Sequence, residues 1–537
     1  MSHICVTRQP HGAATSSDVI TDADVLNAHL EDAAHYPGGR AAGIAYPRTE
    51  ADVSAIVSAH AAILPIGAQS SLTGGATPYD DVLLSTSRMN QILEVDGHRA
   101  TCEAGVALSA LEEAIRQRAR ATYPPRPTFT GAFAGGTVAT NAAGAATFKY
   151  GSTRNWVDAL TVILANGEAL DISRGRCVAS NQQFVIRTSK GELNVPVPTY
   201  QMPAVAKRSA GYFAAPDMDL IDLFIGSEGT LGIITSITLR LLSPAPAIAL
   251  ALVMCPSEEI GLRLASALRA CSVETWRSGD PHGIDTCAIE HLDRRSLEVV
   301  REENPTATLK VAVPANAEMA LLIQLELPHG TRTDAAYEQI ASALSPEADG
   351  PLVRFCRLVD EFGLMDSTEF AAPGDERRSG ELLAFREAVP AAVNRRVGYA
   401  KRTIDARIEK TAADMVVPFH EFAAMMQVYR DGFSARGLDY AVWGHLSDGN
   451  VHPNVIPRSY EDVVAGKDAI LEFGRVAARL GGCPLAEHGV GRNPVKQALL
   501  RELYGEKGIE QMRAVKRALD PEWKLAPGVI FERLSPQ

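Results

Sequence analysis

Two histidines, an aspartate and two asparagines lie close together in WGHLSDGNVHPN, residues 443–454, directly after the apolar run DYAV. His445 and His452 flank a Gly–Asn turn, and further along the chain LAEHGVGRN supplies Glu487 and His488 side by side. Two imidazoles and a carboxylate form a ligand set for Zn²⁺, Mn²⁺ or Fe²⁺ that leaves positions open for a substrate. Because most histidines are structural residues, these residue types alone leave a metal site and an ordinary polar core as alternatives.

Two cations upstream are candidates for holding an anionic group. Arg386 lies in LLAFREAVPAAVNRR, whose spacing predicts a helix, and Lys410 lies in IEKTAADMVVP, before a predicted strand. Arginine can bind a carboxylate through two parallel hydrogen bonds, and either cation is costly to bury without such a partner. The alternative is that both side chains lie on solvated faces of a charged protein.

Three loops of small residues come earlier in the chain. They are PIGAQSSLTGGATP (65–78), TGAFAGGTVATNAAGAATFKYGS (130–152) and FIGSEGTLGIIT (224–235). Glycine lets the backbone adopt positive φ and approach a ligand, and successive N–H groups then form an anion-binding nest. None of the loops contains a P-loop or the G-x-G-x-x-G fingerprint, and one loop alone is most simply a surface turn. Three of them predict a long ligand, such as a dinucleotide, that contacts backbone in several places.

In this order and spacing the three loops resemble the FAD-binding domain of the vanillyl-alcohol oxidase type, over about residues 46–243. In that family the first loop wraps the FAD pyrophosphate, the second passes the ribityl chain and isoalloxazine, and the third lies near the adenine half. The FAD contacts implied by the resemblance are Ile66, Gly67, Ala68, Gln69, Ser70, Ser71, Thr73, Gly74, Thr137, Thr140, Asn141, Gly144, Glu228, Gly229 and Ile233. The first loop lacks the His or Cys of members with covalent flavin, so we expect noncovalent FAD.

The later motifs resemble those of a narrower family. GHLSDGNVH and EHGVG are similar to the paired signatures of FAD-linked 2-hydroxy acid dehydrogenases: D-lactate dehydrogenase, D-2-hydroxyglutarate dehydrogenase and the glycolate oxidase flavin subunit. KLAPGVIF near the end extends the resemblance through the C-terminal domain. The resemblance implies that His445, His452 and Glu487 bind a divalent metal and that His488 is the base.

The same resemblance suggests a role for the two cations, and the chain departs from the family's pattern at one position. Arg386 and Lys410 match positions at which relatives bind the substrate carboxylate, so we expect them to act in catalysis. Ser447 stands where many members have glycine, a change that we expect to alter only the turn.

The implied reaction is the FAD-dependent oxidation of a 2-hydroxy acid, expected to be D-configured, such as D-lactate, D-2-hydroxyglutarate or glycolate, to the 2-oxo acid. Metal coordination would lower the pKa of the substrate hydroxyl, His488 would remove its proton, and the Cα hydride would pass to flavin N5. The eight cysteines never form a C-x-x-C pair, so electrons would leave for an external acceptor: a quinone, a cytochrome, an electron-transfer flavoprotein or an iron–sulfur subunit.

Three alternative functions stay open at this point. One is an oxidase that uses O₂ on the same substrates. Another is a flavin transferase similar to alkyl-dihydroxyacetonephosphate synthase, although that enzyme has a histidine-rich run where this chain has GHLSDGNVH. The third, a non-catalytic flavin-binding subunit, is disfavoured because all four His and Glu positions are present.

The length and the net charge of the chain limit the number of domains and the kinds of partner that it can have. A chain of 537 residues predicts two or more domains, and a net charge of −12 argues against nucleic acid or an anionic membrane as the main partner. No segment has the apolar length of a membrane-spanning helix, and the N-terminus lacks the pattern of a signal peptide. We expect a cytoplasmic protein; peripheral association with the inner membrane and a homodimer are left open.

The predicted fold class is α+β: a two-part FAD-binding domain of the vanillyl-alcohol oxidase type, and an α+β substrate (cap) domain with a helical C-terminal part. The proline-rich LLSPAPA places the boundary, so the expected parts are an N-terminal segment (1–42), the FAD-binding domain (43–245) and the substrate domain (246–537). Periodicity predicts helices at 49–62, 107–119, 258–271 and 334–345, strands at 231–241, 319–327 and 352–359, and a hairpin at Asn166–Gly167. We expect a second sheet covered by helices on one face, and an insertion or mobile segment at 174–218.

Overall fold

The computed structural model describes residues 4–15, 18–125, 127, 129–303 and 310–532, and the chain divides into two compact units. The first unit comprises residues 1–144, 151–243 and 483–537, and the second comprises 145–150 and 244–482.

This division differs from the one expected from the sequence at both ends of the chain. The last segment returns to the first unit because Leu525 pairs with Ile63 and is fully buried. The N-terminal segment is no separate part either, since β1 pairs with a strand of the same unit.

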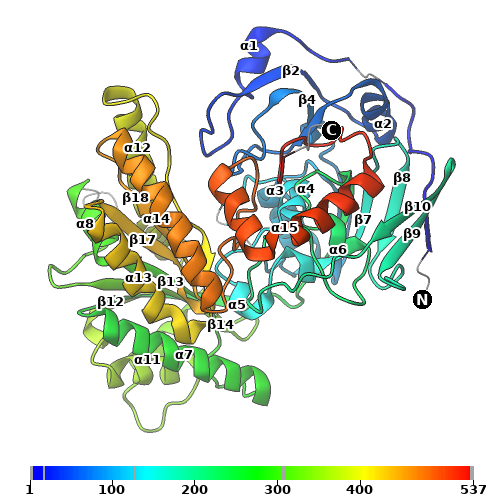
Figure 1. Cartoon of the computed structure of the whole chain (residues 1–537). Helices are drawn as coiled ribbons and strands as arrows, with labels where there is room; N and C mark the ends of the chain where they lie inside the picture. The colour runs from blue at the N-terminus through cyan, green and yellow to red at the C-terminus, as the bar shows by residue number, and fades with distance from the viewer. Residues whose placement is uncertain (1–3, 16–17, 126, 128, 304–309, 533–537) are drawn as a thin grey trace. The chain divides into compact units, whose positions relative to one another are not determined.

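The described strands of the first unit form three sheets. Their orders are β2 (Arg40–Ala45), β4 (Tyr79–Ser85), β3 (Ile63–Ile66); β5 (Ile92–Val95), β6 (Arg99–Glu103), β11 (Ile233–Arg240), β7 (Val157–Ile163), β8 (Ala169–Ser173); and β1 (Ile4–Val6), β9 (Gln183–Thr188), β10 (Gly191–Pro196). The helices include α1 (Ala23–Asn27), α2 (Glu50–Ala59), α3 (Leu108–Ala119), α4 (Ala134–Ala139), α6 (Ile221–Phe224) and α15 (Pro494–Leu519). Figure 1 shows these elements along the chain.

Local signals explain several of these elements. Helix α2 begins after Thr49, whose side chain accepts from the Asp52 N–H in a capping box, and its apolar residues Val53 and Ile56 are fully buried. The predicted hairpin is present as β7–β8, with Gly167 at a φ of +84° in the turn. The segment 174–218, which had no assigned structure, contains the hairpin β9–β10.

The second unit is built on one antiparallel sheet. Its strand order is β15 (Thr368–Ala371), β12 (Ala247–Cys255), β14 (Met319–Leu327), β13 (Thr286–Asp293), β17 (Tyr440–His445), β18 (Asn450–Val455) and β16 (Met415–Val416). The helices include α5 (Thr147–Tyr150), α7 (Glu258–Ser278), α8 (Arg294–Glu302), α10 (Thr333–Ala341), α11 (Pro351–Glu361), α12 (Glu376–Thr403), α13 (Phe422–Ala435) and α14 (Tyr460–Arg479).

Helices cover both faces of this sheet, so the expectation of a single covered face was wrong. Leu250 and Leu252 of β12 pack into one core cluster with Phe385 of α12. Cys255, which points to the opposite face, lies against Gly261 of α7. A strand buried on both faces is apolar at nearly every position, which is why β12 shows no alternation.

The predicted strand at 352–359 is instead helix α11. Its β-branched and aromatic residues favoured a strand, but its buried positions have helical spacing. They are Leu352, Val353, Phe355, Cys356 and Val359. Pro351 at the first turn also suits a helix start, because its missing N–H would have no intrahelical partner there.

Among the helices of the described residues, none combines the length and apolarity needed to cross a bilayer.

Candidate active site

A cavity of about 290 Å³ in the first unit is lined by all three loops of small residues. The expected FAD contacts in its wall are Ile66, Gly67, Ala68, Gln69, Ser70, Ser71, Thr137, Thr140, Glu228, Gly229 and Ile233. The other expected contacts, Thr73, Gly74, Asn141 and Gly144, do not line it. Asn141 instead shapes the second loop, because its Oδ1 accepts hydrogen bonds from Ser152 Oγ and Arg154 N.

The backbone of these loops fits a long ligand. Gln69, Asn141 and Glu228, one in each loop, adopt the left-handed conformation with φ of +51°, +50° and +52°, which is uncommon for residues other than glycine. Gly136 lies in the cavity wall, and a Cβ added there would have no atom within 4 Å, so a side chain would enter open space. Small residues therefore leave backbone accessible along the wall, as a dinucleotide requires.

Glu228 also holds the EHGVG loop. Its carboxylate accepts hydrogen bonds from Val490 N and Gly491 N, each at 2.8 Å. Burial raises the pKa of Glu228 to about 7, although both N–H groups and Lys496 act in the opposite direction. A Cβ on Gly491 would lie 2.3 Å from Thr73 O, so the loop packs against its neighbours only with glycine at this position. The loop that carries Glu487 and His488 is thus fixed to the flavin-type loops, and both residues line the cavity.

The expected metal ligand Glu487 has a buried cationic partner. Lys207 Nζ lies 3.0 Å from Glu487 Oε2, and the Lys207 side chain is completely buried. A buried lysine requires such a carboxylate, because an unpaired charge would pay the full cost of desolvation. His488 Nε2 lies 3.4 Å from Glu487 Oε1, with about a quarter of the imidazole side chain exposed. Sequence reasoning missed Lys207, which lies in the segment that had no assigned structure.

The two expected imidazole ligands meet in the second unit. His445 ends β17 and His452 lies in β18, and the two strands form a hairpin. Their ring centroids are 5.6 Å apart, and each ring offers a nitrogen within 4.8 Å of the other's. Gly449 in the turn has a φ of +81°, and a Cβ there would lie 2.1 Å from Val417 O. Ser447 has no positive φ, so the turn accepts serine at that position.

Glu290 of β13 organises both His445 and Arg386. Its Oε1 lies 2.5 Å from His445 Nδ1, and its Oε2 accepts from Arg386 Nε at 2.7 Å. Burial alone would raise the pKa of Glu290, but the charges of Arg386 and His445 lower it to about 2. A carboxylate at Nδ1 leaves His445 Nε2 for a metal, the usual arrangement behind metal-binding histidines.

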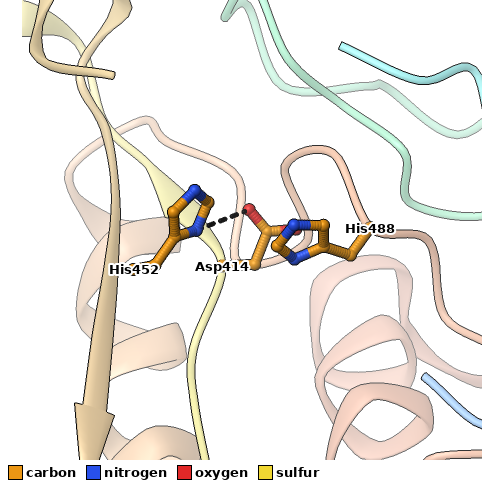
Figure 2. Close-up of side chains that lie close together, drawn as sticks. All are labelled: Asp414, His452 and His488. Atoms are coloured by element: carbon orange, nitrogen blue, oxygen red, sulfur yellow. Dashed lines mark ion pairs between the residues drawn. The ribbon is translucent and has the colours of Figure 1, made fainter. Parts of the chain in front are cut away.

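His452 also has a carboxylate behind it. Asp414 Oδ1 lies 3.7 Å from His452 Nδ1 and accepts a hydrogen bond from Asn450 Nδ2 at 3.2 Å. Figure 2 shows the Asp414 carboxylate facing the His452 ring. Neither Glu290 nor Asp414 was predicted from the sequence. For Glu290 the available signal was its position as a single charged residue inside the apolar run CAIEHL.

The two expected substrate-binding cations differ in their partners. Arg386 is buried on α12 and donates from Nε to Glu290 and from Nη1 to Glu387, while Nη2 has no hydrogen bond within the described chain. Lys410 is partly exposed and has no ion pair or hydrogen bond among the described residues. Burial nevertheless lowers the pKa of Lys410 to about 8. An unpaired lysine in such surroundings suits an anionic ligand.

Family comparisons match both parts of the chain. Residues 41–173 match the FAD binding domain family, and residues 273–530 match the family of FAD linked oxidases, C-terminal domain. The chain belongs to the FAD-linked oxidase family. This FAD-linked oxidase is therefore an FAD-dependent oxidoreductase with a vanillyl-alcohol oxidase-type FAD-binding domain, which confirms the expected family and α+β fold class.

Curated relatives of the FAD-linked oxidase cover most of its length. It is 28% identical to the D-2-hydroxyglutarate dehydrogenase of Xanthomonas citri pv. viticola, over 91% of this chain and 89% of the relative. It is 28% identical to the glycolate oxidase subunit GlcD of Bacillus subtilis (91% and 88%) and 27% identical to the D-lactate dehydrogenase of Archaeoglobus fulgidus (91% and 91%). A solved structure of alkyldihydroxyacetonephosphate synthase matches with a TM-score of 0.57, covering 96% of this chain and 82% of that one. At 14% identity this likeness shows the fold alone.

Proposed function

We propose that this FAD-linked oxidase oxidises a 2-hydroxy acid, either a D-configured one or the achiral glycolate, to the 2-oxo acid and passes the electrons to an external acceptor. The observation that carries the proposal is the double contact of Glu290 with Arg386 and His445, the residues to which we assign the substrate carboxylate and the metal. Relatives named as D-2-hydroxyglutarate and D-lactate dehydrogenases over most of the chain support the same reaction class.

The substrate carboxylate is assigned to two cations of the second unit. Lys410 is a cation without a carboxylate partner among the described residues, and Arg386 keeps Nη2 available for a second hydrogen bond. Because Glu290 already holds the Arg386 Nε, the guanidinium is oriented before substrate binds, which reduces the entropy lost on binding.

The chemistry at the hydroxyl group is assigned to the histidines and Glu487. When bound, FAD supplies a hydride acceptor and a divalent metal supplies a Lewis acid for the hydroxyl oxygen. His445, His452 and Glu487 would hold that metal, and the contact of Glu290 with His445 Nδ1 would leave Nε2 as the ligand atom. His488, partly exposed on the cavity wall, would take the hydroxyl proton.

Anaerobic reduction of the bound flavin tests the proposal directly. The purified holoenzyme is mixed with D- and L-forms of lactate and 2-hydroxyglutarate and with glycolate, and the bleaching of the flavin absorbance is followed. We expect one of the D-acids or glycolate to reduce the flavin, with the 2-oxo acid as product. Reduction by an L-acid alone, or absence of reduction by all of these acids, would overturn the assignment. Stoichiometric hydrogen peroxide under air, at the rate seen with an artificial acceptor, would instead identify an O₂-using oxidase.

A further inference from the structure

A second cavity, of about 320 Å³, lies within the second unit and has no part in the proposed reaction. It is bounded by the ends of β13 and β17 and by residues of α8 and α13. His291 lines it from the face of β13 opposite Glu290, since neighbouring residues of a strand point to opposite faces.

Three side chains in its wall carry polar atoms that have no hydrogen-bond partner. Both ring nitrogens of His291, the Tyr429 hydroxyl and Glu258 Oε1 are buried and have no hydrogen bond with any described residue. His291 and Tyr429 are each only 1% exposed. Buried polar atoms nearly always have a partner, so three unsatisfied groups around one cavity point to a polar occupant. Burial lowers the pKa of His291 to about 4, which leaves a neutral imidazole that can accept one hydrogen bond.

The charged residues around the cavity indicate which sign of charge an occupant should carry. Five carboxylate side chains and three arginines line it. Each arginine already has a carboxylate: Arg430 pairs with Glu258, Arg294 with Glu318 and Arg295 with Asp439. The wall therefore has an excess of negative charge, and burial raises the pKa of Asp293 to about 6, with the nearby charge of Glu258 adding to the increase. A cationic occupant is favoured over an anionic one.

We propose that this cavity binds a small organic ammonium ion. The Glu258 carboxylate would accept hydrogen bonds from the ammonium group through Oε1, and the Tyr429 oxygen and the acceptor nitrogen of His291 are further unpartnered acceptors in the same wall. Its hydrocarbon part would lie against Met319, Met426 and Leu438. A metal ion is a poorer candidate, because these residues form no cluster with metal-ligand spacing among the described residues.

The position of the site links it to the strands of the candidate active site. His291 follows Glu290 in β13 and pairs with Gly444, the residue before His445 in β17. An occupant would therefore contact the reverse face of the two strands that hold Glu290 and His445.

Calorimetric titration of the holoenzyme with three probes of equal length tests the proposal. The probes are butylammonium, butan-1-ol and butyrate, which differ in charge and not in hydrocarbon size. We expect saturable, one-site binding of butylammonium that is at least about tenfold tighter than that of the neutral or anionic probe. No saturable binding of any probe would mean that the cavity holds only water, and equal binding of all three would remove the charge argument; either result overturns the proposal.

Variants locate the binding in this cavity. Glu258→Gln should weaken butylammonium binding about tenfold or more. Glu259→Gln, the same change on an exposed neighbouring residue that does not line the cavity, should leave binding unchanged. Tyr429→Phe removes a hydroxyl that has no partner within the described chain, so the protein should fold normally while binding weakens several-fold. Unchanged binding in both cavity variants would refute the assignment even if butylammonium binds elsewhere.

Discussion

Replacing Glu290 by glutamine removes the negative charge that contacts both Arg386 and His445, two residues of the proposed active site. The amide keeps the shape of the carboxylate, but its NH₂ group must face either His445 Nδ1 or Arg386 Nε, whose contacts with Glu290 are 2.5 Å and 2.7 Å. Breaking a buried ion pair by neutralising one partner costs about 3–5 kcal/mol. Arg386 keeps its second carboxylate, Glu387, so we expect the lower end, a loss of about 3 kcal/mol in the free energy of unfolding.

Glu387→Gln is the matched control. It removes the other carboxylate of the same guanidinium, but the Glu387 side chain is half exposed, so the loss should be below about 1 kcal/mol. Both variants are unfolded in urea at pH 7 with a chelator present, and metal affinity is then measured on the folded proteins by competition with a coloured chelator. Because Glu290 orients His445, Glu290→Gln should bind the metal about 10- to 100-fold more weakly, and Glu387→Gln should match the parent.

The comparison between the two variants can refute the reasoning. If Glu290→Gln and Glu387→Gln have the same stability and the same metal affinity, the buried carboxylate organises neither residue. A loss of stability with unchanged metal affinity would support the stabilising role of the Glu290–Arg386 ion pair and would refute the claim that Glu290 orients His445 for metal binding.

Four further predictions follow from the geometry. Lys410 is a cation only below its pKa of about 8, so kcat/KM should fall as pH rises through 8, and Lys410→Arg, which stays charged, should abolish that step in a pH profile. His488→Ala should lower kcat by about 10²- to 10⁴-fold in steady-state assays while flavin content stays normal. Burial raises the pKa of Glu228 from 4.5 to about 7, so its contribution to stability is present below pH 4.5 and is lost as pH rises through 7. In cofactor-free protein, the free energy of unfolding in urea of Glu228→Gln, relative to that of the parent, should therefore increase by up to roughly 3 kcal/mol as the pH rises from about 5 to 8. Acid precipitation should release FAD into the supernatant; flavin retained in the pellet would show a covalent link.

The sequence by itself determined those features that are set by residues close together in the chain: the loops, one hairpin and one helix. The three loops could be recognised because glycine and other small residues are needed locally wherever backbone must approach a ligand, and eleven of the expected FAD contacts line one cavity. The His445–His452 hairpin was predictable for the same reason: an apolar strand, a Gly–Asn turn and a second strand lie within sixteen residues, 440–455. Helix α12, which carries Arg386, also follows from local spacing.

Only the tertiary structure decided which charges are paired. Glu290 contacts Arg386 across 96 residues of chain and His445 across 155, and no local pattern specifies a partner at such separations. Lys207 and Glu487 meet in the same way, because folding buries both and an unpaired buried charge would be too costly. The return of residues 483–537 to the first unit has a similar cause: Leu525 is buried beside β3, a contact that depends on the packing of distant segments and leaves no trace in the composition of either.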